Sequence, residues 1–110
     1  MVAPSTGAVV LVPFPFSDLS SSKLRPAVVL ADAARGDWIL CQITSNPYSD
    51  PRAVELHTSD FAHGSLHRAS FARPVRLFTA QQRLIVAKVA QLSDAAFARL
   101  IDAVVKVFKP

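Results

Sequence analysis

The chain has 110 residues, of which 51% are hydrophobic and 18% are charged, a balance that indicates one globular domain and excludes an intrinsically disordered chain. The formal net charge is +4, and residues 52–88 hold the basic excess together with all three histidines. A basic zone attracts polyanions such as nucleic acid, although a solvated surface with surplus arginine accounts for the charge equally well.

Two features bear on where the protein works. Cys41 is the only cysteine, so an intrachain disulfide is impossible and a reducing compartment is expected. The longest apolar run, Ala8–Val12, is far shorter than a membrane span, and the first residues lack the basic and then apolar pattern of a secretory signal. We therefore expect a cytoplasmic protein with no membrane partner.

Short strands separated by turns are predicted along most of the chain. β-branched and apolar runs bounded by Pro, Gly, Ser or Asp indicate six strands. These are Val9–Val12, Ala27–Ala31, Trp38–Ile43, Ala53–Leu56, Val75–Phe78 and Leu84–Val89. Turn signals occur at Ser20–Ser22, Arg35–Asp37 and Asn46–Pro51. Spacings of about ten residues favour a compact antiparallel barrel over alternating strand–helix units.

The C-terminal segment predicts an amphipathic helix. Ser93 stands where an N-cap belongs, and Asp94 follows in the first turn, where a negative charge opposes the helix dipole. Apolar residues then recur from Phe97 to Phe108 at helical spacing. This helix is expected either to pack on the barrel or to form part of a dimer surface, and the sequence does not choose between them. The chain is thus mostly β with a C-terminal helix.

Several common catalytic signatures are absent from the sequence. There is no GxxxxGK[ST], GxGxxG, HExxH or CxxC motif, which argues against nucleotide-fold, zinc-protease and thiol-redox chemistry. Cys41 lies in a strand-like segment and is expected to be a small core residue. His57, His63 and His67 show no metal-ligand spacing, and we expect them to be loop residues.

Arg25 is the first candidate for chemistry. It lies directly before Pro26, at the entry to an apolar strand and after a loop that contains Phe14, Phe16 and four serines. A guanidinium held at a strand start can form two hydrogen bonds to phosphate oxygens. Taken alone, an ordinary surface arginine at the end of a strand explains the motif better.

Two later segments are weaker candidates. Ile43–Asn46 ends an apolar strand with two hydroxyls and an amide, which can position a phosphate or simply initiate a turn before a proline. In Ser70–Thr79, alternation places Phe71 and Arg73 on one face of an extended segment. Aromatic and arginine side chains together can bind bases and phosphates, and core phenylalanines with solvent-facing arginines explain the same pattern.

The order of these motifs carries a family resemblance. The chain shows GAVVLVPFPFSD, KLRPAVVL, a strand ending in ITSN, a loop with Gly64 leading to SFARPVRLFT, and KVAQLS before the helix. From about Gly7 to Ser93 this resembles the PemK/MazF-like toxins, the endoribonucleases of type II toxin–antitoxin pairs. The resemblance implies an SH3-like small barrel of the PemK/MazF/CcdB type, usually a homodimer. It also implies a cognate antitoxin with an acidic, partly disordered segment.

The resemblance further implies sequence-selective cleavage of single-stranded RNA without metal or cofactor. The ribose 2′-OH attacks its own phosphate and gives a 2′,3′-cyclic phosphate and a 5′-OH. Arg25 matches the family's catalytic arginine, which stabilises the phosphate, and Thr44 matches its catalytic threonine or serine. The residues expected to contact RNA are Phe16, Asp18, Ser20, Ser21, Ser22, Lys23, Ser45, Asn46, Ser70, Arg73 and Arg76.

The sequence departs from the family pattern at two places. Ala8 replaces the acidic residue that usually follows the first glycine, and no carboxylate lies near Arg76, where some members have one. The general base is therefore left open between Asp18, a histidine and water. The alternative to an enzyme is a non-catalytic SH3-like module that binds nucleic acid or protein. A toxin acting on a protein such as gyrase is less favoured, because the helix ends in VKVFKP without a tryptophan anchor.

Overall fold

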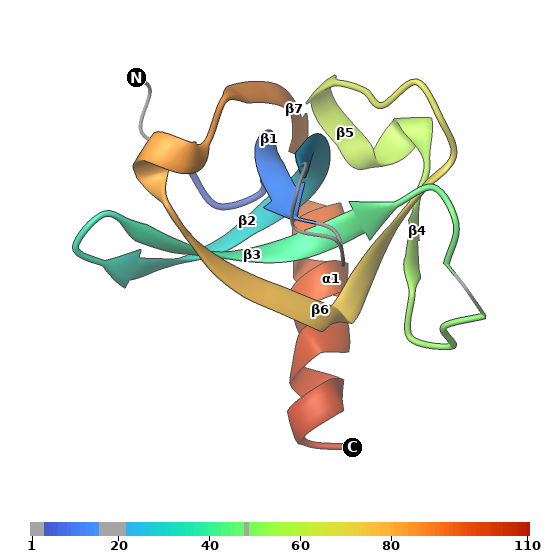
Figure 1. Cartoon of the computed structure of the whole chain (residues 1–110). Coiled ribbons are helices and arrows are strands. Elements are labelled where there is room, and N and C mark those ends of the chain that lie inside the picture. The colour runs from blue at the N-terminus through green and yellow to red at the C-terminus, as the bar shows by residue number, and fades with distance from the viewer. Residues whose placement is uncertain (1–3, 16–21, 48) are drawn as a thin grey trace.

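A computed structural model describes residues 4–15, 22–47 and 49–110, and within them a curled antiparallel sheet carries one C-terminal helix (Figure 1). The strands follow the order β4-β6-β3-β2-β1-β7-β5 and form a half-barrel. They are β1 (Ala8–Pro15), β2 (Ser22–Ala34), β3 (Asp37–Thr44), β4 (Val54–Leu56), β5 (Phe61–Gly64), β6 (Ser70–Gln81) and β7 (Ala87–Leu92). Two 3-10 turns, η1 (Thr58–Asp60) and η2 (Gln82–Leu84), and the helix α1 (Asp94–Phe108) complete the described fold. The predicted class, mostly β with a C-terminal helix, is confirmed.

Some predicted boundaries were wrong. Residues 84–86 are not part of a strand, because Gln82–Leu84 forms η2 and β7 begins only at Ala87. This turn is closed by a hydrogen bond from the Ile85 amide to the Gln82 carbonyl. Strand β5 was not predicted at all, and β6 is much longer than the predicted Val75–Phe78.

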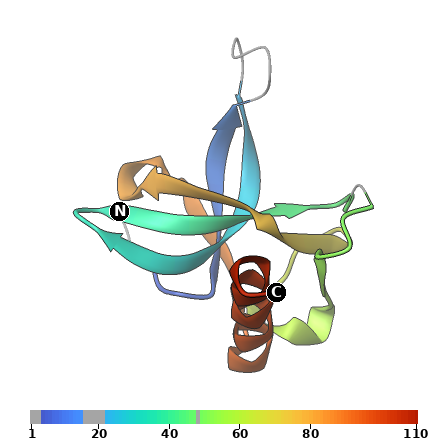
Figure 2. The same ribbon diagram turned by 90° about the horizontal axis from the view of Figure 1, so that it is seen from below.

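The first hairpin is longer than the sequence indicates. Strand β1 continues through Pro13 to Pro15, where Ser22 of β2 is its partner. Prolines are tolerated there because β7 pairs only with Ala8–Leu11, so the outer edge of this part of β1 needs no amide donors. Figure 2 shows the ends of β1 and β2 projecting together from the rest of the sheet. Of the predicted turn at Ser20–Ser22, residues 20–21 lie outside the described residues, and Ser22 was wrongly included because β2 begins there.

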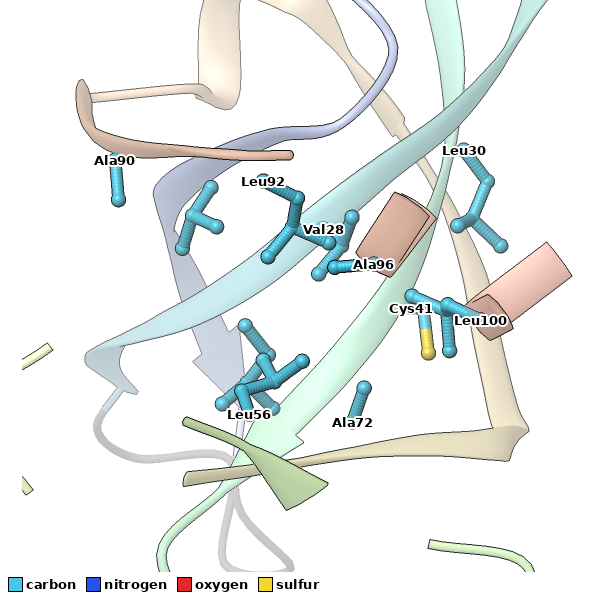
Figure 3. Packing of buried hydrophobic residues seen from close by; sticks show 11 residues of the cluster. Val28, Leu30, Cys41, Leu56, Ala72, Ala90, Leu92, Ala96 and Leu100 are labelled. Atoms are coloured by element: carbon cyan, nitrogen blue, oxygen red, sulfur yellow. The ribbon is translucent and has the colours of Figure 1, made fainter. Parts of the chain in front are cut away.

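The hydrophobic core lies on both faces of the sheet, as alternation of side chains along the strands requires. On one face, Val28 and Cys41 pack with Ala96 and Leu100 of α1 (Figure 3). The opposite face has its own cluster, which includes Val10, Val12, Ala27, Val29 and Leu40. The helix therefore packs on the sheet, and truncating a side chain such as Leu100 to alanine is expected to cost about 2–5 kcal/mol.

Ser93 and Asp60 fix the start of the helix. The Ser93 hydroxyl accepts a hydrogen bond from the Ala96 amide at 3.2 Å, which confirms the predicted N-cap. Asp60 accepts from the His57 amide at 2.7 Å and pairs with Arg99 of α1 at 3.0 Å. Burial alone would raise the pKa of Asp60, but these two partners lower it below its ordinary value. The ionised carboxylate thus joins η1 to α1.

Candidate functional site: a pocket below the projecting hairpin

A cavity of about 370 Å³ opens where β1, β2, β3 and β6 meet the segment between β5 and β6. We call this cavity the candidate pocket, and residues 65–69 the β5–β6 loop. The walls of the candidate pocket combine apolar, hydroxyl and cationic side chains. The lining residues are Leu11, Phe14, Arg25, Pro26, Gln42, Ile43, Thr44, Ser45, Leu66, His67, Arg68 and Ser70.

The pocket brings together the two residues that the family resemblance marks as catalytic. Arg25 lies in the outer part of β2, opposite Val12 of β1, and its side chain is exposed. Thr44 is the last residue of β3, where pairing with Phe71 of β6 ends that strand. Both residues line the same cavity although they are far apart in sequence.

The Thr44 hydroxyl already has partners within the chain. It donates a hydrogen bond to the Asn46 carbonyl at 2.9 Å and accepts one from the Asn46 amide at 3.1 Å. This local turn holds the side chain at the strand end. A hydroxyl has one proton to donate, so donation to a ligand phosphate would require Thr44 to release the Asn46 carbonyl.

Ser70 is a buried residue that lines the candidate pocket. Its side chain is buried, with 5% of the residue surface exposed, and its hydroxyl donates to the Arg68 carbonyl at 2.9 Å. At the other end of the β5–β6 loop, Gly64 has φ +66° and approaches β7 so closely that a Cβ there would clash with the Val89 carbonyl. The loop that carries His67 and Arg68 is therefore fixed at both ends.

Sequence reasoning missed His67 and Arg68 as pocket residues, and it assigned Phe14 to a loop rather than to a strand. His67 lies in a loop as predicted, and this loop contributes Leu66, His67 and Arg68 to the pocket lining. Nothing in the local sequence distinguishes His67 from the other two histidines, and only the tertiary fold places it beside Arg25. Phe14 belongs to β1 and packs edge-on against Phe78, with ring centroids 5.3 Å apart.

Several predicted RNA-contacting residues do not line the pocket. Lys23, Asn46 and Arg76 are exposed but lie outside its walls, whereas Ser45 and Ser70 are in them. The remaining predictions cannot be placed: Phe16, Asp18, Ser20 and Ser21 lie outside the described residues, as does the side chain of Ser22.

Arg73 occupies a structural position. Its guanidinium Nε donates to Asp50 Oδ2 at 3.0 Å, and only 14% and 6% of the two side chains are exposed. The backbone amide of Arg52 donates to the other Asp50 oxygen at 2.9 Å. The Arg52 hydrogen bond is the largest influence on the pKa of Asp50, and the Arg73 bond adds to it. Together they outweigh the effect of burial, so the pKa of Asp50 is lowered. Pairing of β3 with β6 skips Arg73–Arg76, and β6 bends sharply there (Figure 1).

The electrostatic character of the pocket is positive. Arg25 and Arg68 line it, and no carboxylate does among the residues that the structure describes. A second cavity of about 350 Å³ shares Leu66, His67 and Arg68 with it, and Glu55 and His57 lie on the far side. The candidate pocket is thus suited to an anion with an apolar portion.

The described part of the chain shows no other reactive centre. Cys41 is fully buried in the core as predicted, and burial raises the pKa of its thiol to about 12. The described residues contain no cluster of three His, Cys, Asp or Glu side chains that could hold a metal ion. They likewise contain no helix long and apolar enough to cross a membrane.

Comparisons with known proteins agree on one family. Residues 5–108 match the family described as PemK-like, MazF-like toxin of type II toxin-antitoxin system. The chain superposes on MazF from Deinococcus radiodurans with a TM-score of 0.76 at 20% identity, covering 100% of both chains. The MazE–MazF complex from that organism gives 0.79 at 18% identity, over 99% of this chain and 98% of the other. No curated protein matches the sequence.

A mycobacterial endoribonuclease in complex with its cognate antitoxin is a further structural neighbour. It superposes with a TM-score of 0.75 at 13% identity, over 99% of this chain and 96% of that one. Identities this low establish the likeness of the fold.

Proposed function

Because the chain belongs to the PemK-like, MazF-like toxins of type II toxin–antitoxin systems, we propose that it is an endoribonuclease that cleaves single-stranded RNA in the candidate pocket. The observation that carries the proposal is the meeting of Arg25 and Thr44 in one cavity whose described walls are cationic and hydroxyl-rich. RNA, most simply mRNA, is the polyanion, and its bases supply the apolar surface. Such a substrate places the protein in the cytoplasm.

The proposed reaction is attack of a ribose 2′-OH on the adjacent phosphorus, with release of a 5′-OH and formation of a 2′,3′-cyclic phosphate. Negative charge builds on the phosphate oxygens in the transition state, and the proposed role of Arg25, which lines the pocket, is to bind them with two hydrogen bonds. Thr44 holds the scissile phosphate once its hydroxyl turns from the Asn46 carbonyl to the substrate. Ser45 and Ser70 lie on the same walls as further polar groups for the ribose and phosphate.

We propose that cleavage is independent of metal ions. Arg25 and Arg68 both line the pocket and remain protonated at all physiological pH values, so they can supply the positive charge that a divalent cation supplies in many nucleases. Excess EDTA is therefore expected to leave the rate unchanged.

We also propose an antitoxin and a second copy of the chain as partners. Structural neighbours include MazE–MazF and a mycobacterial endoribonuclease with its cognate antitoxin. An acidic, extended antitoxin segment would compete with RNA for Arg25 and Arg68 and would become ordered on binding. Large apolar side chains stay exposed on the monomer, and burying some of them in a homodimer would stabilise it: Leu24, Val75, Leu84, Val86, Val105 and Phe108.

The test of the enzymatic proposal compares two arginine variants. Arg25→Ala is expected to lower the cleavage rate of a long single-stranded RNA by about 10²–10³-fold, the usual effect of losing a group that stabilises transition-state charge. Arg83→Ala removes an exposed arginine of η2 that does not line the pocket, and it should cleave at the rate of the unsubstituted protein. Far-UV circular dichroism and thermal unfolding check that both variants fold.

A non-catalytic binding module is the second candidate function. The absence of a carboxylate among the described lining residues favours it, because family members with an acidic base would lose activity without one. A binding module is expected to bind RNA more weakly as the salt concentration rises and to leave the RNA uncleaved. Cleavage by the unsubstituted protein would contradict the binding module, and full cleavage activity of Arg25→Ala would contradict the role of the pocket.

A further inference from the structure

We propose that His67 is the general base of the reaction, taking the proton from the attacking ribose 2′-OH. This inference rests on the proposed endoribonuclease function and assigns a step for which the sequence gives no residue. It follows from the composition of the pocket walls. Among the described lining side chains the imidazole is the strongest proton acceptor, because the others are apolar groups, guanidinium cations, hydroxyls and an amide.

The other polar lining groups are poor proton acceptors. Arg25 and Arg68 carry guanidinium groups that do not deprotonate in proteins. The hydroxyls of Thr44 and Ser70 donate to the backbone carbonyls of Asn46 and Arg68, and a hydroxyl is a very weak base. Imidazole accepts a proton readily near neutral pH, which is why histidine is the side chain most often used for general acid–base catalysis.

The position of His67 is fixed by the fold. The β5–β6 loop is held by the tight approach of Gly64 to β7 at one end and by the Ser70–Arg68 hydrogen bond at the other. His67 lines both the candidate pocket and the second cavity. It is an exposed residue and is open to substrate.

Charged and titratable residues line the two cavities that His67 also lines. Arg25 of β2 and Arg68 of its own loop share the candidate pocket with it. Glu55 of β4 and His57 share the second cavity. The arginines bind the phosphate, which brings the neighbouring ribose to the wall that His67 forms.

The chemical step balances without another reactant. A ring nitrogen of His67 takes the 2′-OH proton as the O2′–P bond forms and the P–O5′ bond breaks. The leaving O5′ takes a proton from water, and the imidazolium then returns its proton to the hydroxide left behind. The products are a 2′,3′-cyclic phosphate and a 5′-OH, with no net release of protons.

The experiment uses an RNA oligonucleotide that contains a cut site mapped with the unsubstituted full-length protein. His67→Gln keeps a polar side chain of similar reach but cannot act as a base, and His67→Ala removes the ring. His63→Gln is the matched control, because His63 is an exposed residue of β5 that lines neither cavity. Asp18→Asn tests the competing acidic base. Affinity is measured with the same oligonucleotide carrying 2′-deoxyribose at the cut, which binds without being cleaved.

The expected result is a fall in kcat of about 100-fold or more for both His67 variants, the range for loss of a general base. Affinity for the uncleavable oligonucleotide should change less than about threefold, and added imidazole should partly restore His67→Ala. The unsubstituted rate should fall in acid, where a protonated base cannot accept the 2′-OH proton, and the His67 variants should lose this dependence. His63→Gln should behave as the unsubstituted protein.

Two outcomes would overturn the inference while leaving the enzyme assignment intact. One is a kcat of His67→Gln within about threefold of the unsubstituted value while Arg25→Ala is inactive. The other is a loss of rate and pH dependence in Asp18→Asn that the His67 variants do not share. If the unsubstituted protein leaves RNA intact, the proposed function itself fails.

Discussion

Replacing Arg73 by alanine should destabilise the fold strongly, because this arginine is the partner of a buried carboxylate. Only 6% of the Asp50 side chain is exposed, and Arg73 Nε lies 3.0 Å from its Oδ2. Without the guanidinium, Asp50 keeps the hydrogen bond from the Arg52 amide and the weaker attraction of the Arg52 charge but loses the ion pair with Arg73. Breaking one side of a buried ion pair costs about 3–5 kcal/mol. Because Asp50 keeps the Arg52 hydrogen bond, we expect about 3 kcal/mol.

The pH dependence of this loss has a definite sign. The pKa of Asp50 is lowered in the folded protein, so the stabilisation by the pair is complete above the unfolded aspartate pKa of about 3.9 and is lost as pH falls through the folded value. The difference in unfolding free energy between the unsubstituted protein and Arg73→Ala should therefore be constant from pH 7 to about pH 5. Below about pH 4 it should narrow as Asp50 becomes protonated.

Urea unfolding followed by circular dichroism at several pH values measures this difference. Arg83→Ala is the control, since removal of an exposed arginine is expected to change stability by less than about 0.5 kcal/mol. A change of that small size for Arg73→Ala at pH 7, combined with a weaker affinity for RNA, would refute the structural role. It would support the prediction that Arg73 contacts RNA.

Three further predictions concern the scaffold. Gly64→Ala should destabilise the protein by about 1–3 kcal/mol in urea unfolding, because φ +66° strains an alanine and its Cβ would meet the Val89 carbonyl; an unchanged midpoint would contradict the close β5–β7 approach. Ser93→Ala should cost about 1 kcal/mol through loss of the helix cap, and Ser93→Asp, which retains a capping oxygen, should lose less. Cys41 should resist alkylation at pH 8 in the native state and react once urea unfolds the chain, since burial raises its pKa to about 12; rapid native labelling would show that the core is open.

The sequence is most informative where local rules decide the structure. The helix was predictable because Ser93 and the apolar spacing after it satisfy capping and periodicity at once. The position of Thr44 at a strand end was also visible, since an apolar run precedes it and polar residues follow. Arg25 was expected at the entry to a strand but lies within β2, which begins at Ser22. Chain-wide motif order then indicated the family, which the match over residues 5–108 confirms.

Features that depend on distant contacts could not be predicted. Strand β5 has four residues and is stabilised by pairing with β7, more than twenty-five residues later in the chain. The pairing of Arg73 with Asp50 depends on the bend in β6. The position of His67 in the pocket lining depends on the path of the β5–β6 loop between its two strands. No local pattern distinguishes an arginine that binds RNA from one that neutralises a buried aspartate.

The central claim is that the candidate pocket cleaves RNA by 2′-OH attack. Its most direct test is to incubate the purified protein with a long single-stranded RNA in excess EDTA and to determine the chemistry of the new ends. We predict discrete cuts that carry 2′,3′-cyclic phosphate and 5′-OH ends and that disappear in Arg25→Ala. Intact RNA, or fragments with 5′-phosphate ends, would contradict this account.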